Sequence, residues 1–135
     1  MQVRVVSKAE LLVRTKTFGL RILNVVDHLP RTMSARAIGP RLVRCGTSVG
    51  ANYPAACRSR SRAEFAAKLG IVAEEADETM YWLEVLRDAK LLPEGRLSEL
   101  SKEANELTAI FTAGRRSSSR TQTSNLKIQT SNISS

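Results

Sequence analysis

Apolar side chains recur at alternating intervals of three and four residues in four successive segments of this chain. Such spacing places them on one face of an α-helix, whereas a half-buried β-strand alternates at every second residue. Four such helices with short connections predict an all-α protein, an antiparallel up-down four-helix bundle. The four apolar seams are Leu11, Thr15, Phe18, Ile22, Val25 and Leu29; Ala35, Ile38, Leu42, Cys45, Val49, Asn52 and Ala56; Phe65, Leu69, Val72, Ala76, Thr79, Leu83 and Leu86; and Leu97, Leu100, Ala104, Leu107 and Phe111.

Local signals predict where these helices begin and end. Pro30 ends the first helix, because the residue before a proline avoids the α-helical region. Ser34 is the expected N-cap of the second helix, and Ser61 with Glu64 forms a capping box for the third. Gly114 is the expected C-cap of the fourth helix. The predicted helices cover about residues 8–29, 34–59, 62–90 and 95–113, after a flexible lead-in at residues 1–7.

The composition changes at residue 115. Residues 115–135 contain no acidic residue, four basic residues and an excess of Ser, Thr, Asn and Gln. We predict a disordered basic tail, because this segment has too little apolar surface to offset the entropy of ordering it. No run of 18 or more apolar residues is present, and residues 1–7 are too short and broken for a secretory signal. A cytoplasmic protein without a membrane segment is expected.

Positive charge is concentrated in one part of the chain. The formal net charge is +8, and residues 31–62 hold seven arginines and no acidic residue. A polyanion is the first partner to consider, since guanidinium groups bind phosphate oxygens in a bidentate manner. Tyr53 is the only aromatic residue within residues 31–62, so contacts to the RNA or DNA backbone are expected without base stacking. The candidate nucleic-acid-binding residues are Arg36, Arg41, Arg44, Arg58, Arg60 and Arg62.

Two other interpretations of these charges stay open. Solvated arginine faces keep a small domain soluble without binding anything. Alternatively, the basic second helix of one copy pairs with the third helix of another, because residues 63–90 carry seven acidic and three basic residues. The protein would then be a protein–protein interaction scaffold with no direct nucleic-acid role.

The third helix carries a second stripe beside its seam. It mixes large apolar side chains with carboxylates and consists of Ile71, Glu75, Glu78, Trp82 and Val85. An exposed stripe of this kind predicts a subunit interface in a homo-oligomer. A wide core face on a central helix explains the same pattern equally well.

Three residues of the second helix have expected structural roles. Gly46 and Gly50 permit another backbone to approach closely. Asn52 falls on the apolar seam, where a buried amide requires hydrogen-bond partners. Pro54 lacks an N–H and is expected to loosen the last turn, which frees backbone groups to pair with Asn52.

Residue patterns that support catalysis are missing from the sequence. No Cys/His cluster suits a metal ion, no Glu-x-x-His pair suits a di-metal bundle, and residues 46–50 lack the lysine of a phosphate-binding loop. The sequence therefore predicts a non-enzymatic protein with no catalytic residue, no metal and no cofactor.

Several short motifs together resemble a known family. They are Leu-Pro-Arg-Thr at 29–32, Leu-Val-Arg-Cys-Gly-Thr-Ser-Val-Gly-Ala-Asn at 42–52, Ser-Arg-Ala-Glu-Phe at 61–65, Lys-Leu-Gly-Ile at 68–71, Glu-Glu-Ala-Asp-Glu-Thr at 74–79, Tyr-Trp-Leu-Glu at 81–84 and Leu-Leu at 91–92. Over about residues 8–114 the chain resembles the 23S rRNA-intervening-sequence proteins. It departs from them at residues 53–57, where many members have a different and often acidic ending.

The resemblance implies a short antiparallel bundle that assembles into a ring, commonly a pentamer. Some members of the family are encoded inside insertions in ribosomal RNA genes. Related proteins are accessory partners of the reverse transcriptase in diversity-generating retroelements and contact nucleic acid through a basic surface. The partners it implies are therefore RNA or DNA, a ribosomal component or a reverse transcriptase.

Overall fold

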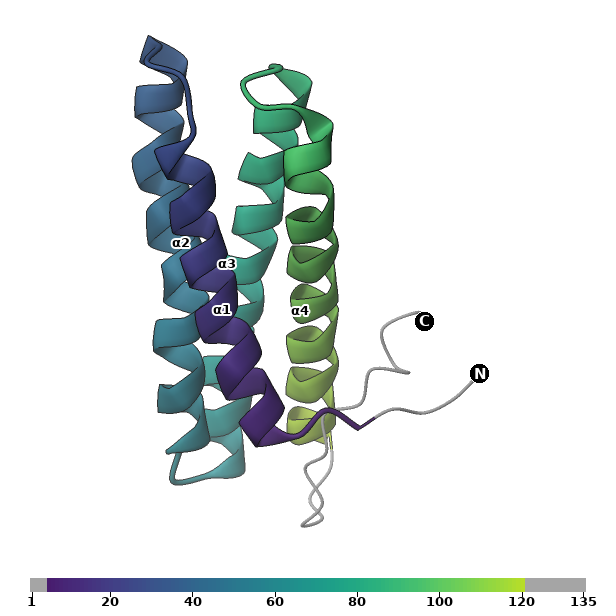
Figure 1. Cartoon of the computed structure of the whole chain (residues 1–135). Helices are drawn as coiled ribbons and strands as arrows, with labels where there is room; N and C mark the ends of the chain where they lie inside the picture. The colour runs from purple at the N-terminus through teal and green to yellow at the C-terminus, as the bar shows by residue number, and fades with distance from the viewer. Residues whose placement is uncertain (1–4, 121–135) are drawn as a thin grey trace.

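The structure is a computed structural model that describes residues 5–120, except for the side chain of Arg120. It contains four helices in this range: α1 (Lys8–Asp27), α2 (Met33–Cys57), α3 (Arg62–Asp88) and α4 (Glu94–Arg120). Successive helices run antiparallel and pack side by side, while α1 leans across α2 and α4 (Figure 1). The predicted up-down four-helix bundle is confirmed.

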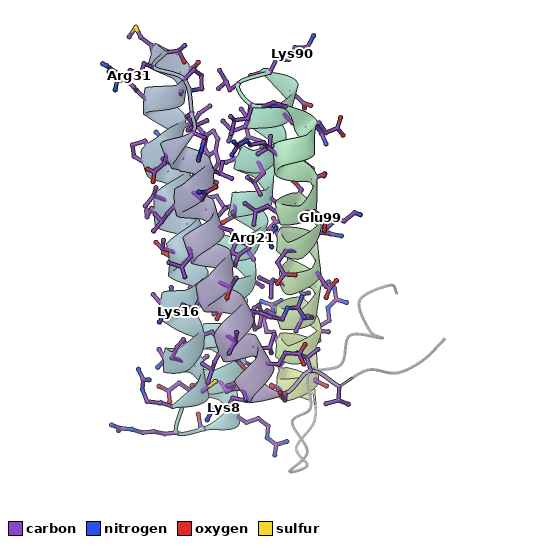
Figure 2. The ribbon with its side chains drawn as sticks, in the orientation of Figure 1. Lys8, Lys16, Arg21, Arg31, Lys90 and Glu99 are labelled. Atoms are coloured by element: carbon purple, nitrogen blue, oxygen red, sulfur yellow. The ribbon has the colours of Figure 1, made fainter. Side chains whose placement is uncertain are left out.

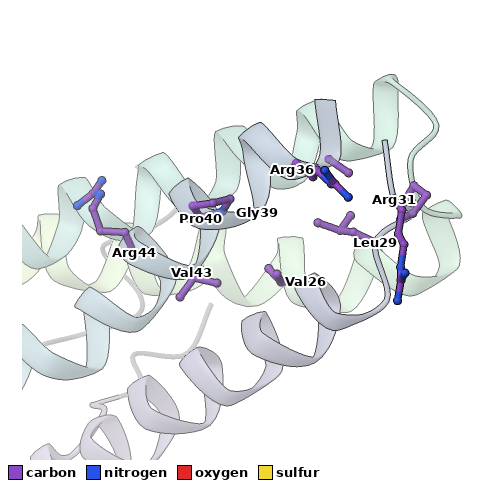
Figure 3. A pocket seen from close by; sticks show the side chains of 10 residues that line it. Val26, Leu29, Arg31, Arg36, Gly39, Pro40, Val43 and Arg44 are labelled. Carbon is purple, nitrogen blue, oxygen red and sulfur yellow. The ribbon is translucent and has the colours of Figure 1, made fainter. Parts of the chain in front are cut away.

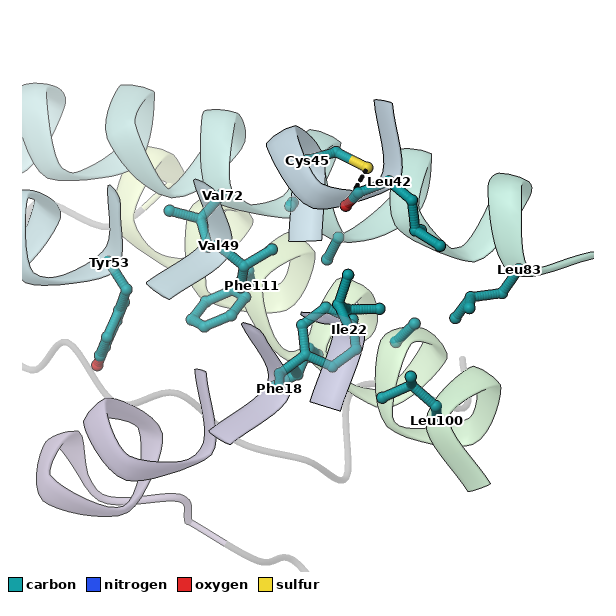
Figure 4. Close-up of a cluster of buried hydrophobic side chains, with 14 of the residues drawn as sticks. Phe18, Ile22, Leu42, Cys45, Val49, Tyr53, Val72, Leu83, Leu100 and Phe111 are labelled. Atoms are coloured by element: carbon teal, nitrogen blue, oxygen red, sulfur yellow. Dashed lines mark hydrogen bonds between the residues drawn. The ribbon is translucent and has the colours of Figure 1, made fainter. Parts of the chain in front are cut away.

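The apolar seams form the core of the bundle. Phe18, Ile22, Leu42 and Phe111 are almost fully buried and meet between the helices (Figure 4). Burial of each such side chain stabilises the fold by about 1.5–3 kcal/mol. The seam threonines are also buried, and the hydroxyl of Thr15 donates a hydrogen bond to the carbonyl of Leu11 at 2.8 Å. A polar seam position is thus tolerated because its donor is satisfied within its own helix.

The N-terminal caps agree with the sequence analysis at α3 but not at α2. Ser61 accepts a hydrogen bond from the Glu64 N–H at 3.1 Å. Glu64 in turn accepts one from the Arg60 N–H at 2.7 Å, one residue before the N-cap. Thr32, and not Ser34, caps α2, because Thr32 has an extended backbone and its hydroxyl accepts from the Ala35 N–H. Ser34 lies in the first turn of the helix.

The first three helices end slightly earlier than predicted, while the fourth ends later. α3 ends in a Schellman motif, in which Leu91 N–H donates to Leu86 O and Lys90 N–H to Arg87 O, both at 3.0 Å. Lys90 has a φ of 58°, which is the left-handed conformation that glycine favours.

α4 continues past Gly114 to Arg120, so Gly114 is not its C-cap, and residues 115–120 are not part of a disordered tail. Gly114 and Ser118 continue the seam of Leu107 and Phe111 with the same three-and-four spacing, and both are buried. This extension lies beside the beginning of α3, since Arg115 reaches Gly70. The predicted disorder of residues 121–135 lies outside the described residues.

Small residues of α2 set the distance between α1 and α2. A Cβ added at Gly46 would lie 2.7 Å from Cγ1 of Ile22, and one at Gly50 would lie 3.0 Å from the carbonyl oxygen of Thr15. The two helices therefore approach closely at the glycines, as the sequence predicts.

Asn52, in contrast, does not lie in the core. It is half-buried, and its Nδ2 donates to the Ser48 carbonyl at 2.8 Å. Tyr53 occupies the core position instead, with its ring centroid 5.2 Å from that of Phe111. α2 continues through Pro54 to Cys57, so the expected pairing of Asn52 with backbone freed by Pro54 is also wrong.

Candidate nucleic-acid interface

The fold divides the six candidate arginines into three groups along α2. Arg36 and Arg58 are separated by about 33 Å at 1.5 Å per helical residue. Arg36 lies near the α1–α2 connection, Arg41 and Arg44 lie in the middle of α2, and the last group lies at the α2–α3 connection. That last group comprises Arg58, Arg60 and Arg62. The arginines therefore do not form one continuous face.

Arg44 is held by acidic residues of its own chain. Its Nη1 lies 3.2 Å from Oε2 of Glu75, and its Nη2 lies 2.8 Å from Oε1 of Glu78. The hydrogen bond to Glu78, followed by that to Glu75, raises the pKa of the Arg44 guanidinium above its ordinary value. Arg44 is a predicted nucleic-acid-binding residue, but its charge is already compensated by Glu75 and Glu78 of α3.

Arg41 contacts the same part of α3. Its guanidinium carbon lies 5.8 Å from the ring centroid of Trp82, a cation–π distance, and Trp82 Nε1 donates to Oε2 of Glu78 at 3.3 Å. We call the five residues Arg41, Arg44, Glu75, Glu78 and Trp82 the α2–α3 cluster. Because this cluster lies at the contact between two helices of one chain, its members have partners before any second molecule is considered.

Three of the five predicted interface residues, Glu75, Glu78 and Trp82, thus belong to the α2–α3 cluster. Val85 is half-buried and packs against the core. Ile71 is 48% exposed, which leaves it accessible to another molecule. The role of these five residues in assembly stays a prediction.

A second group of cations gathers at one end of the bundle. The α2–α3 connection, the beginning of α1 and the end of α4 all lie at this end, where Lys8 is labelled (Figures 1 and 2). Its exposed basic side chains, which form no ion pair with any residue that the structure describes, are Lys8, Arg58, Arg60, Arg115 and Arg116. We call this group the basic end. Arg62 lies beside it, half-buried and with an interaction of its own.

Two acidic residues near the basic end, Glu64 and Glu10, are already paired. Glu64 binds the Arg60 N–H and lies 3.3 Å from Nζ of Lys68, and the first of these contacts is the main reason why the pKa of its carboxyl is lowered. Glu10 lies 3.8 Å from Arg14. Glu74 and Asp77 line a pocket together with Arg115 between α3 and α4, so they offset part of the positive charge of Arg115.

Sequence reasoning missed three members of the basic end. The sequence pattern places Arg115 and Arg116 in the tail because Gly114 resembles a C-cap, and Lys8 lies far from the arginines in sequence. The signal that could have found the two arginines is the continuation of the α4 seam through Gly114 and Ser118.

The remaining candidate, Arg36, lies at a pocket of about 520 Å³ between α1 and α2 (Figure 3). The pocket is floored by apolar side chains, among them Val26, Leu29 and Val43, and Arg31 and Arg36 stand at its edge. Neither arginine has an acidic partner in the described part of the chain.

Residues 5–120 show neither a metal-binding cluster nor a membrane-spanning helix. No group of three or more His, Cys, Asp or Glu side chains there is arranged to hold a metal ion. Among the described helices, none is both long and apolar enough to cross a membrane.

The fold and its surface define a small antiparallel four-helix bundle with a paired ionic cluster on its side and a basic end. The model of the family described as 23S rRNA-intervening sequence protein matches residues 7–113. The chain belongs to this family.

A solved structure supports the same assignment. The bundle is similar to a crystal structure from Bacteroides thetaiotaomicron, described as a protein with unknown function from the S23 ribosomal protein family. The two sequences are 30% identical, the match covers 75% of this chain and 94% of the other, and the TM-score is 0.70. No curated protein matches the sequence.

Proposed function

We propose that this protein is a non-enzymatic, homo-oligomeric four-helix bundle that binds the backbone of RNA or DNA in the cytoplasm. Its context would be ribosomal RNA or a reverse transcriptase, for which it would serve as an accessory factor. The observation that carries the proposal is the basic end, where five exposed cations from three separate segments form no ion pair with the described residues.

The proposed contact set differs from the set of arginines in the sequence. Arg41 and Arg44 are left out, because their guanidinium groups already contact Trp82, Glu75 and Glu78. Arg58 and Arg60 remain, and Arg115 and Arg116 join them. Arginine suits this role because its planar group binds two phosphate oxygens at once.

Assembly would multiply the effect of the basic end. In a ring of parallel copies, for example a pentamer, the basic ends of all subunits would face one side. Several weak phosphate contacts on one rigid particle then act together, since each further contact after the first is intramolecular. The proposed affinity therefore depends on the oligomer as well as on the arginines.

Fluorescence anisotropy with a labelled generic single-stranded RNA tests the proposal. At about 50 mM salt, where backbone contacts are strong, the wild type should bind, and the double variant R58Q/R60Q should bind about tenfold more weakly. The control K90Q/R96Q removes the same charge from exposed residues at the opposite end of the bundle and should change the affinity less than about twofold. No binding by the wild type, or equal losses in both variants, would refute the proposal.

A protein–protein interaction scaffold is the second candidate. The observation that favours it is the α2–α3 cluster, which uses two of the six candidate arginines inside the protomer. A large oligomer in light scattering, together with no affinity for RNA or DNA at low salt, would support this candidate over the first.

A further inference from the structure

The outer side of α1 and α2 carries an unusual amount of exposed apolar surface. Leu20 and Leu23 of α1 are 58% and 38% exposed. They border a pocket of about 510 Å³ between the two helices, which is lined on the α2 side by Ala51 and Pro54. The pocket at Val26 and Val43 lies between the same two helices, nearer the α1–α2 connection. We call the two pockets together the α1–α2 groove.

The groove has a positively charged edge. Lys16, Arg31 and Arg36 line its two pockets (Figures 2 and 3), and none of the three forms an ion pair with a residue in the range 5–120. An occupant that fits this surface would bring apolar side chains for the floor and carboxylates for the edge.

One surface of the same chain has that composition. On α3, Ile71, Glu74, Asp77, Tyr81 and Glu84 follow one another at intervals of three or four residues, and all five are exposed. Ile71 is 48% and Tyr81 55% exposed. The three carboxylates have no ion-pair partner among the described residues. We call these five residues the α3 stripe.

A chain cannot place its own α3 stripe in its own groove. α3 packs against α2 and α4, while no Cα atom of α1 lies within 8 Å of a Cα atom of α3 in the described residues. α1 and α3 are therefore diagonal in the bundle, and the outer side of α3 faces away from the groove. The lengths nevertheless match: the stripe spans about 20 Å and the groove, from Leu12 to Leu29, about 26 Å at 1.5 Å per residue.

We propose that the α1–α2 groove of one copy receives the α3 stripe of a second copy. This inference rests on the homo-oligomer of the proposed function and names the two surfaces that build it. Ile71 and Tyr81 pack over the apolar floor, and the carboxylates of the stripe face Lys16, Arg31 and Arg36. The contact joins two different surfaces, so it repeats from copy to copy and closes into a ring if the rotation permits.

This interface differs from the one that the sequence predicts. Glu75, Glu78 and Trp82 stay in the α2–α3 cluster, and the neighbouring exposed positions take over the contact with the second copy. Ile71 belongs to both sets. The acidic third helix still meets a basic partner, but that partner includes α1 as well as α2.

Two double variants and their mixture test the pairing by multi-angle light scattering. L20E/L23E damages the groove and leaves the stripe intact, while I71K/Y81K does the reverse. Each variant alone should be a monomer, because a head-to-tail contact needs both surfaces. Their equimolar mixture should form a dimer of twice the 14.9 kDa chain mass, since one intact groove and one intact stripe remain.

The control is M33E, which changes an apolar side chain that is 89% exposed and lies outside both surfaces. It should keep the wild-type mass, and circular dichroism should show that all variants are folded. Unchanged oligomers in the double variants would overturn the inference. Two monomeric variants that do not form a dimer when mixed would overturn it too. So would an oligomer that only the groove variant dissociates, because this result indicates a groove-to-groove contact or an unrelated partner site.

The two proposals fail separately. A wild type that is monomeric at all concentrations contradicts the homo-oligomer and with it this interface. An oligomer that binds RNA but ignores both double variants contradicts this interface alone. Loss of RNA binding with an intact groove-to-stripe dimer contradicts the nucleic-acid role alone.

Discussion

Arg14 of α1 binds Glu103 of α4 through two parallel hydrogen bonds, Nε to Oε2 at 2.9 Å and Nη2 to Oε1 at 2.8 Å. Nη2 also donates to Oε1 of Glu106 at 2.7 Å. The hydrogen bond to Glu103 is the largest cause of the raised pKa of Arg14. The side chain of Arg14 is 17% exposed. Among the contacting helix pairs, α1 and α4 contact each other least, so this ion cluster is the main polar link across that side of the bundle.

Replacing Arg14 by alanine should therefore lower the free energy of unfolding by about 2–3 kcal/mol, because the partly buried carboxylate of Glu103 loses its two hydrogen bonds and the exposed Glu106 loses one. The control is Lys102→Ala, which removes an exposed ion pair with Glu99 and should change stability by less than about 0.5 kcal/mol. Urea unfolding followed by circular dichroism measures both. Equal effects of the two substitutions would show that Arg14 contributes no more than a surface charge.

Gly46→Ala should destabilise the bundle by about 1–3 kcal/mol, because its Cβ would lie 2.7 Å from Cγ1 of the fully buried Ile22. Gly95→Ala is the matched control, since no atom lies within 4 Å of the added methyl group. It should be neutral or stabilising by up to about 1 kcal/mol, the helix propensity difference between the two residues. Thermal unfolding of both variants would decide, and a neutral Gly46→Ala would contradict the close approach of α1 and α2.

Lys90→Gly should raise the free energy of unfolding by about 0.5–1 kcal/mol, because glycine adopts the left-handed conformation at the end of α3 without a Cβ penalty. Lys90→Ala removes the same charge and keeps the Cβ, so it should give no gain. If both variants were equally stable, charge and not backbone conformation would explain the result.

Cys45 is fully buried, and desolvation is the main reason why the pKa of its thiol is raised. A raised folded-state pKa means that the folded protein holds a proton that the unfolded chain releases. Stability from this group is complete below the unfolded pKa of about 8.5 and declines as the pH rises towards the folded value.

Iodoacetamide at about pH 8.5 should accordingly label the half-buried Cys57 first and Cys45 only on global unfolding. Both cysteines lie in the tryptic peptide of residues 45–58, so tandem mass spectrometry of this peptide assigns each label and measures the two rates. Equal labelling of both cysteines in the native protein would contradict the burial of Cys45.

The fold was predictable because the apolar spacing of each helix lies within its own segment of the sequence. Within one helix, the three-and-four spacing of core residues such as Phe18 and Ile22 in α1, or Leu42 in α2, depends only on neighbours in sequence. The cap at Ser61 is equally local. The error at Asn52 has a simple cause. A straight α-helix has 3.6 residues per turn, so a strict seven-residue count drifts, and Tyr53 turned inward instead.

The candidate site was less predictable because it depends on contacts between segments that are distant in sequence. Arg44 and Glu78 pair only because α2 and α3 pack at one particular register, which the apolar pattern does not specify. The basic end likewise joins Lys8, Arg58 and Arg115 from three segments. Neither arrangement is visible until the helices are placed together.

The salt dependence of RNA binding tests the central claim most directly. For wild type and the quadruple variant R58Q/R60Q/R115Q/R116Q, log K is plotted against log salt concentration between about 50 and 200 mM. Each phosphate contact with a single strand contributes about 0.7 to the steepness of this plot. For the quadruple variant we therefore expect a slope that is shallower by about 3 for each subunit that contacts the RNA. A measurable wild-type slope that the four substitutions leave unchanged would contradict this expectation.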